Sequence, residues 1–187
     1  MEKTKWSNIY VISGASYVCG FCGRLVGPAF GYPGEATRIN PAIYICTYCQ
    51  KPTFCYGEEQ VPAPAYGNQV LHVPHEVSSL YEEARRCMSV SAYTAAVLAC
   101  RKLLMNIAVK KNAPEGKSFL EYVDYLCDKG YVTTENKGWV DHIRKKGNEA
   151  NHQITEVCSK DAEDLISFSE MLLKIVFEFP GRIPGTP

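Results

Sequence analysis

The sequence predicts a mainly α-helical protein, a helical bundle preceded by a small β-rich segment. From residue 76 onward, apolar residues recur at the three- and four-residue spacing of amphipathic helices. Residues 1–75 instead hold 8 of the 14 glycines and 7 of the 11 prolines, with only short β-type runs. At 187 residues, 46% hydrophobic and 21% charged, the chain suits one helical domain with a small appendage.

Three segments are predicted along the chain. Residues 1–56 are rich in cysteine and glycine and contain β-type runs at 9–12 and 43–45. Residues 57–75 carry three prolines and two glycines without a helical period, which predicts an extended connector. Residues 76–187 form the predicted helical domain.

Five helices are predicted within the helical domain. They are a helix over 76–89, a second that Ser91 caps and that runs to about Lys111, a third from Ser118 to a stop at Gly130, a fourth over 137–152, and a fifth that follows Ser159 and ends at Pro180. The second is apolar almost all round at its start, so we expect it to be central in the bundle. Because the apolar surface of this helix has to be buried on every side, the pattern also favours a homodimer, in which a second copy of the chain would cover part of it.

Charge and hydropathy exclude several classes of protein. Twenty basic and twenty acidic residues leave no net charge, so no global field attracts DNA or a membrane. No apolar run approaches 18 residues, and the start of the sequence lacks the apolar core of a signal peptide. Nine cysteines, an odd number without such a leader, indicate a reducing compartment. We therefore expect a cytoplasmic protein without a membrane segment.

The strongest motif consists of two C-x-x-C pairs, Cys19 with Cys22 and Cys46 with Cys49. A two-residue gap lets both sulfurs of a pair face one cation, and two pairs complete a tetrahedral shell of four thiolates. This donor set suits zinc, and it leaves no open position for catalysis. The sequence therefore predicts one structural zinc ion per chain.

Other readings of these cysteines stay open at this point. They could be a redox pair, an iron site or unrelated reduced thiols, although redox C-x-x-C sites normally occur singly at a strand–helix junction. Cys55 is either a spare thiol packed near the site or a replacement for Cys49. His72 and His75 lie in and at the end of the connector, where surface or turn positions are favoured over metal ligation.

A second candidate site contains three consecutive cations, Arg144, Lys145 and Lys146, followed by Asn148 and His152. In a helix, Lys145, Asn148 and His152 share one face, with Arg144 on the adjoining side. Such a face could bind a phosphate of RNA, with the histidine available for proton transfer. The alternative is a solvated helix end, whose cations complement the helix dipole.

Four pieces of the chain resemble the DUF4145 family, an all-helical, HEPN-like group. They are residues 80–85, 95–104, 143–152 and 177–180. The resemblance implies a helical bundle that is often dimeric, with a zinc-ribbon-like cysteine segment as a common N-terminal companion. It also implies a link to restriction or phage-defence systems.

HEPN ribonucleases carry an arginine, then four to six residues, then a histidine, often with asparagine directly after the arginine. His152 matches the histidine and Asn148 matches the asparagine, so Gly147 occupies the arginine position. Arg144 lies one residue outside the allowed spacing from His152, whereas Lys146 lies within it. A lysine lacks the planar fork that holds a phosphate. We therefore expect a non-catalytic binding or scaffold module with an RNA or protein partner. The alternative is a metal-independent ribonuclease that uses Arg144 and His152, with Asn148 orienting the substrate.

Overall fold

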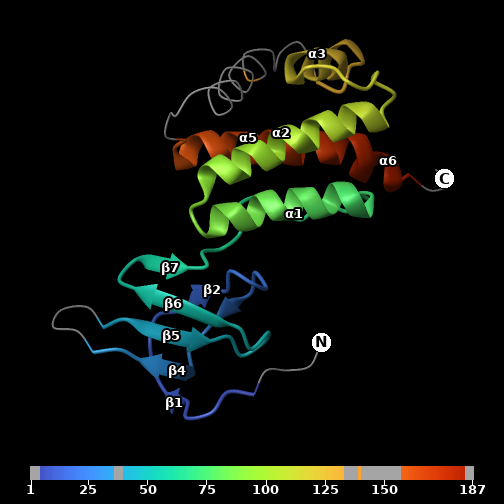
Figure 1. Ribbon diagram of the computed structural model, residues 1–187. Helices are drawn as coiled ribbons and strands as arrows, with labels where there is room; N and C mark the ends of the chain where they lie inside the picture. Colours follow the sequence, from blue (N-terminus) through green and yellow to red (C-terminus); the bar gives the residue numbers. More distant parts are fainter. Residues whose placement is uncertain (1–4, 36–39, 133–138, 140–156, 184–187) are drawn as a thin grey trace. The chain divides into compact units, whose positions relative to one another are not determined.

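The computed structural model describes residues 5–35, 40–132, 139 and 157–183 (Figure 1). The chain divides into two compact units, Met1–Ala65 and Tyr66–Pro187, and the boundary falls within the predicted connector. Of the described residues, 44% lie in helices and 14% in strands.

The fold is therefore mixed, and the prediction of a mainly α protein is wrong. Seven strands are found in the described part of the first unit, where the sequence indicated two β-type runs. Most of these strands are two to four residues long, too short to show a clear alternation of apolar and polar residues. Pairing with distant partners, which local patterns do not report, is what stabilises them.

The first unit contains a five-stranded antiparallel sheet and a two-stranded hairpin. The sheet has the order β1 (Tyr10–Val11), β4 (Phe30–Pro33), β5 (Ala42–Ile45), β6 (Pro52–Tyr56), β7 (Glu59–Val61), and the hairpin pairs β2 (Tyr17–Val18) with β3 (Leu25–Val26). Gly31 allows β4 to approach β5, because a Cβ at this position would lie 2.0 Å from the carbonyl oxygen of Ile43. Glycine is needed where two backbones come this close.

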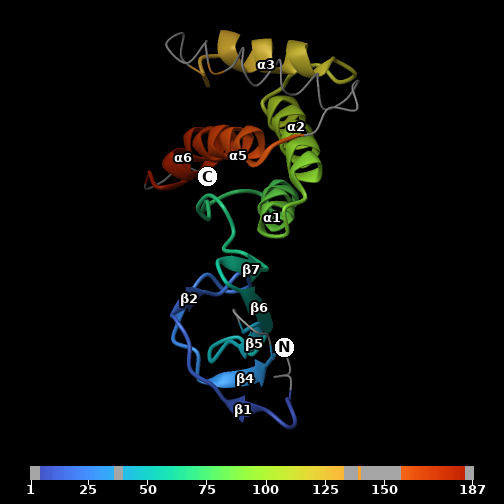
Figure 2. The same ribbon diagram turned by 90° about the vertical axis from the view of Figure 1, so that its left-hand side faces the viewer.

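The β2–β3 hairpin lies against one face of the sheet (Figure 2). The ring of Tyr17 stacks on that of Tyr44, with centroids 5.6 Å apart. The buried cluster between the hairpin and the sheet is small. It consists of Tyr17, Cys19, Val26 and Cys46, with Cys22, Tyr44 and Cys49 packed against it. The core of the first unit is thus built around cysteine side chains.

The second unit is a helical layer with α2 at its centre. Its elements are α1 (His75–Ser89), α2 (Tyr93–Lys110), α3 (Phe119–Asp128), α5 (Ser159–Leu173), the π-helical turn η2 (Lys174–Glu178) and α6 (Phe179–Gly181). Helix α2 packs against α1, α5 and α3, and the two views agree on this arrangement (Figures 1 and 2). Fully buried leucine and isoleucine side chains of α2 and α5 fill the space between them. No helix in the described ranges is long and apolar enough to cross a membrane.

The first three predicted helices are confirmed, with one error at a boundary. Ser91 does not cap α2: it has a left-handed φ of 58°, and the N-cap is Ala92, without a side-chain hydrogen bond. Ser118 does cap α3, and Gly130, with φ of 74°, follows the end of that helix. The predicted helix over 137–152 lies outside the described residues apart from Trp139.

The last predicted helix is found, but it begins one residue earlier than expected, with Ser159 inside the helix and Cys158 as its N-cap, and it is interrupted near its end. Helix α5 passes into the π-helical turn η2 and then into α6, which contains Pro180. Proline has no N–H to donate to the carbonyl of Val176, so a regular α-helix loses a hydrogen bond here. The wider turn directly precedes this position.

Two buried glutamates hold the segment that precedes α1. Glu170 of α5 accepts hydrogen bonds from the backbone N–H of Asn68 (2.7 Å) and from its side-chain amide (3.0 Å). Glu178 accepts one from the N–H of Leu71 (3.0 Å), and the hydroxyl of Tyr81 donates to the carbonyl of Asn68 (3.0 Å). These bonds satisfy backbone groups that an irregular segment would otherwise leave unpaired.

Candidate metal centre

The first cysteine pair lies in the loop between β2 and β3, which we call knuckle 1 (residues 19–24). Its turn is closed by two backbone hydrogen bonds, from Gly23 to the carbonyl of Cys19 (2.8 Å) and from Cys19 to the carbonyl of Arg24 (2.9 Å). Gly23 has a φ of 68°, which glycine adopts without strain. The chain can therefore turn away from the sulfurs directly after Cys22.

The second pair lies between β5 and β6 in knuckle 2 (residues 46–51), which repeats this geometry. Gln50 donates to the carbonyl of Cys46 (2.9 Å), and Cys46 donates to the carbonyl of Lys51 (3.1 Å). Gln50 takes the left-handed position with φ of 59°, which costs a residue other than glycine about 1–2 kcal/mol. The indole N–H of Trp6 donates to the Gln50 carbonyl (2.8 Å) and helps to hold this conformation.

The two knuckles bring all four predicted cysteines together. The four sulfurs lie within 4.8 Å of one another, and those of Cys19 and Cys49, and of Cys22 and Cys46, are each 3.7 Å apart. A disulfide would require about 2.05 Å. A tetrahedral centre with metal–sulfur bonds of about 2.3 Å places its sulfurs about 3.8 Å apart. The cluster therefore has the size of a four-thiolate metal site.

Burial and backbone amides act on these thiols in opposite directions. Burial raises the pKa of Cys46, but the backbone N–H groups of Cys49 and Tyr48 outweigh it and lower that pKa to about 7. Burial raises the pKa of Cys49 to about 12 and also raises that of Cys22. Four thiolates repel one another without a cation, and a bound metal ion reverses this effect by stabilising all of them.

The other candidate ligands lie outside the cluster. Cys55 is on β6 and half-buried, and burial raises its pKa, but Cys49 is the cysteine that completes the group of four. His72 belongs to the second unit, where a Cβ on Gly181 would lie 2.7 Å from its side chain. His75 is the first residue of α1.

The sequence reasoning missed a pair of cation–π contacts that join the knuckles. The ammonium of Lys51 lies 4.8 Å from the ring centroid of Phe21, and the guanidinium carbon of Arg24 lies 4.7 Å from that of Tyr48. Each knuckle thus places a cation over the aromatic ring of the other. The signal was present in the sequence, because both knuckles read C-x-aromatic-C-x-cation.

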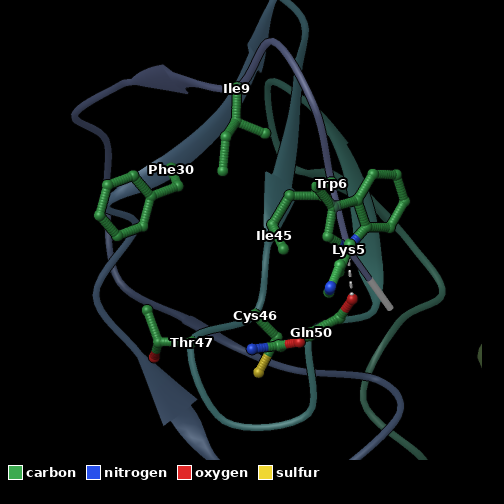
Figure 3. A pocket seen from close by; sticks show the side chains of 8 residues that line it. All are labelled: Lys5, Trp6, Ile9, Phe30, Ile45, Cys46, Thr47 and Gln50. Carbon is green, nitrogen blue, oxygen red and sulfur yellow. Dashed lines mark hydrogen bonds between the residues drawn. The ribbon is translucent and has the colours of Figure 1, made fainter. Parts of the chain in front are cut away.

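A pocket of about 610 Å³ lies beside knuckle 2 (Figure 3). The side chains of Trp6 and Phe30 stand on opposite sides of it (Figure 3). Thr47, Gln50 and Lys5 add polar groups to its lining. No pattern in the sequence pointed to this pocket, since its walls come from three separate segments.

The predicted phosphate-binding residues Arg144, Lys145, Lys146, Asn148 and His152 lie outside the described residues. Their binding role and the ribonuclease alternative stay predictions.

The structure thus defines a protein with a four-cysteine candidate metal centre in one unit and a helical second unit. The sequence profile of the family described as "Domain of unknown function (DUF4145)" matches residues 82–183. This match covers more than half of the chain, so the protein belongs to the DUF4145 family. The cysteine centre lies outside the matched residues. No curated protein and no solved structure matches the chain.

Proposed function

We propose that the protein is a non-catalytic binding module whose first unit is a zinc-ribbon-like domain folded around one structural zinc ion. The observation that carries this proposal is the gathering of the four sulfurs within 4.8 Å, with 3.7 Å contacts between the knuckles. Zinc suits four thiolates in this arrangement, and such a closed site leaves no position for a catalytic water. When bound, the ion would supply folding energy that the small core of this unit lacks.

The second unit, in this proposal, is a HEPN-like domain that forms a homodimer and binds an RNA or protein partner. The support is the family membership together with the cationic run at 144–146. Helix α2 is already covered by α1, α3 and α5 of its own chain, so a dimer would use another surface. A place in restriction or phage defence is the biological setting that the family resemblance favours.

Metal analysis tests the zinc centre. We expect close to one zinc ion per chain in protein purified without chelator, and loss of that zinc in Cys46→Ser, because three thiolates do not close the shell. Cys55→Ser is the matched control and should keep its zinc, since Cys55 lies outside the cluster. Metal-free wild-type protein, or a Cys46→Ser variant with full zinc content, would contradict the proposal.

RNA assays separate the binding role from the ribonuclease alternative. We expect Arg144→Ala to weaken RNA binding, and we expect the affinity to decline with rising salt because each phosphate contact releases counterions.

We expect no appreciable cleavage of RNA, because Gly147 stands at the arginine position and a missing donor to the transition state costs about 10²–10³ in rate. Cleavage that is lost in both Arg144→Ala and His152→Ala would establish the ribonuclease instead. Unchanged affinity after replacing Lys145 and Lys146 by alanine would make this face an ordinary helix end.

A further inference from the structure

We propose that the surface around the two knuckles binds single-stranded nucleic acid by stacking bases on Phe21, Tyr48 and Trp6. This inference rests on the proposed zinc-organised fold, because the metal would hold both knuckles in place. It concerns a different surface from the cationic run at 144–146.

Two exposed aromatic rings form the centre of this surface. Phe21 is 47% exposed and Tyr48 is 56% exposed, although each is directly followed by a cysteine of the metal centre. A structural role in the small core of this unit would bury such rings. Instead, each has a cation over it, Lys51 in one case and Arg24 in the other, and much of each side chain is left open to solvent.

Rings paired with cations suit the two parts of a nucleotide. Every base has a π-face that can stack on an aromatic ring, and arginine and lysine contact the phosphate. An apolar peptide that covered the same rings would desolvate Arg24 and Lys51 without supplying an anion for either. The observed pairing therefore favours a nucleic-acid strand over an apolar peptide.

The pocket beside knuckle 2 continues this surface. Thr47 and Gln50 line it, and Tyr48 lies between them in the same loop. Trp6 and Phe30 stand on opposite sides of the pocket (Figure 3). At about 610 Å³ it lies within the usual range for small-molecule sites, about 300–1,000 Å³. This volume is large enough for a flat base with an aromatic side chain on either side of it.

Polar groups in the pocket lining are available to a base. The hydroxyl of Thr47, the side-chain amide of Gln50 and the ammonium of Lys5 form no hydrogen bond with another residue of the described ranges. Hydroxyl and amide groups can donate to and accept from the Watson–Crick edge of a base, which is unpaired only in a single strand. A duplex hides those edges, so it should bind more weakly.

The charge balance indicates that stacking provides most of the affinity. The first unit, residues 1–65, contains five cations and four acidic residues in a chain with no net charge. A zinc ion with four thiolates carries two negative charges, however, which Arg24 and Lys51 offset. Phosphate attraction should therefore be modest, and the salt dependence should correspond to two or three contacts, each with a slope of about −0.7 in log K against log salt.

The experiment uses the full chain with its zinc and an oligouridine of about 12 nucleotides, a length within the range of about 4–16 nucleotides that one single-strand-binding domain covers. In a Trp139→Phe background, Trp6 is the remaining tryptophan, so its quenching reports a base stacked in the pocket. Titration by fluorescence anisotropy gives the affinity. We expect Phe21→Ala and Tyr48→Ala each to weaken binding about 5- to 100-fold. Tyr56→Ala, an exposed ring at the far end of β6, is the matched control and should bind like wild type.

Zinc content and far-UV circular dichroism, measured on every variant, separate the two proposals. Zinc-loaded, folded protein that binds no oligouridine, or binds it equally in Phe21→Ala and Tyr48→Ala, would overturn this inference and leave the zinc module standing. Capture of a peptide by the same rings, without nucleic-acid binding, would overturn it as well. Protein without zinc would instead overturn the proposed function on which the inference rests.

Discussion

Glu170 shows how one buried side chain joins two segments of the helical unit. It is 9% exposed, accepts two hydrogen bonds from Asn68, and forms an ion pair with Lys174 one turn further along its own helix. Burial raises the pKa of this carboxyl group, but the contacts with Lys174 and Asn68 outweigh burial and hold that pKa below its ordinary value of 4.5. The ionised form is therefore the one that the fold stabilises.

The stability of the helical unit should depend on this ionisation. Because the pKa is lower in the folded state, the contribution is complete above about pH 4.5 and is lost as the pH falls through the folded value. We expect Glu170→Gln to reduce the free energy of unfolding by about 1–3 kcal/mol near neutral pH, since it leaves buried donors poorly paired. In the variant, the free energy of unfolding should also fall less steeply than in wild type as the pH is lowered.

Urea unfolding at several pH values measures both effects. Glu83→Gln, on the exposed side of α1, is the control and should leave the curve unchanged. Equal acid sensitivity in wild type and Glu170→Gln would contradict the conclusion that the ionised form of Glu170 stabilises the helical unit.

Among single residues, the four cysteines were predictable because a C-x-x-C turn is a local structure. Its two sulfurs converge whatever the rest of the chain does. The partners of Phe21 and Tyr48 were not predicted, because Lys51 and Arg24 approach them from the opposite knuckle. That contact exists only after strands distant in sequence have paired.

At the scale of elements, helix α3 begins with a complete capping box. The hydroxyl of Ser118 accepts from the N–H of Glu121 (3.3 Å), and the carboxylate of Glu121 accepts from the N–H of Ser118 (2.8 Å). These bonds, together with the nearby Lys117, lower the pKa of Glu121 to about 2. Both bonds satisfy N–H groups that have no partner inside the helix.

Ser118→Ala removes one half of this box. We expect it to destabilise the helical unit by about 1 kcal/mol, within the range for the loss of an N-cap side chain. Ser118→Asn should restore most of that stability, because asparagine is an equally good cap. The midpoint of thermal unfolding gives the comparison, and equal midpoints for the alanine and asparagine variants would show that the cap contributes nothing.

Helices and strands differed in how far the sequence predicted them. The apolar period of α1 to α3 recurs over several turns, and capping residues mark where α3 begins and ends. Strands such as β2 and β3 have two residues each, so a period of two never repeats. Their existence depends on pairing across knuckle 1, which is a consequence of the turn geometry at Gly23.

At the scale of the whole molecule, the two units have cores of different kinds. The helical unit buries a large apolar cluster drawn from every helix that contacts α2. The first unit has a small cluster in which the cysteines take a large share. The stability of the helical unit should therefore come from apolar burial, and that of the first unit from metal binding.

Removal of the metal should then affect only one of the two units. The chain has two tryptophans, one in each unit, and each reports on its own surroundings. Trp6 donates a hydrogen bond to Gln50 of knuckle 2, whereas Trp139 packs edge-on against Phe168 with ring centroids 5.3 Å apart.

We expect a strong zinc chelator to shift the emission of Trp6 toward that of an exposed indole and to leave Trp139 and the helical dichroism at 222 nm unchanged. Trp139→Phe and Trp6→Phe isolate the two signals, and Cys46→Ser should reproduce the chelated spectrum without chelator. A chelator that melts the helices as well, or that leaves Trp6 undisturbed, would show that the metal does not hold the first unit alone.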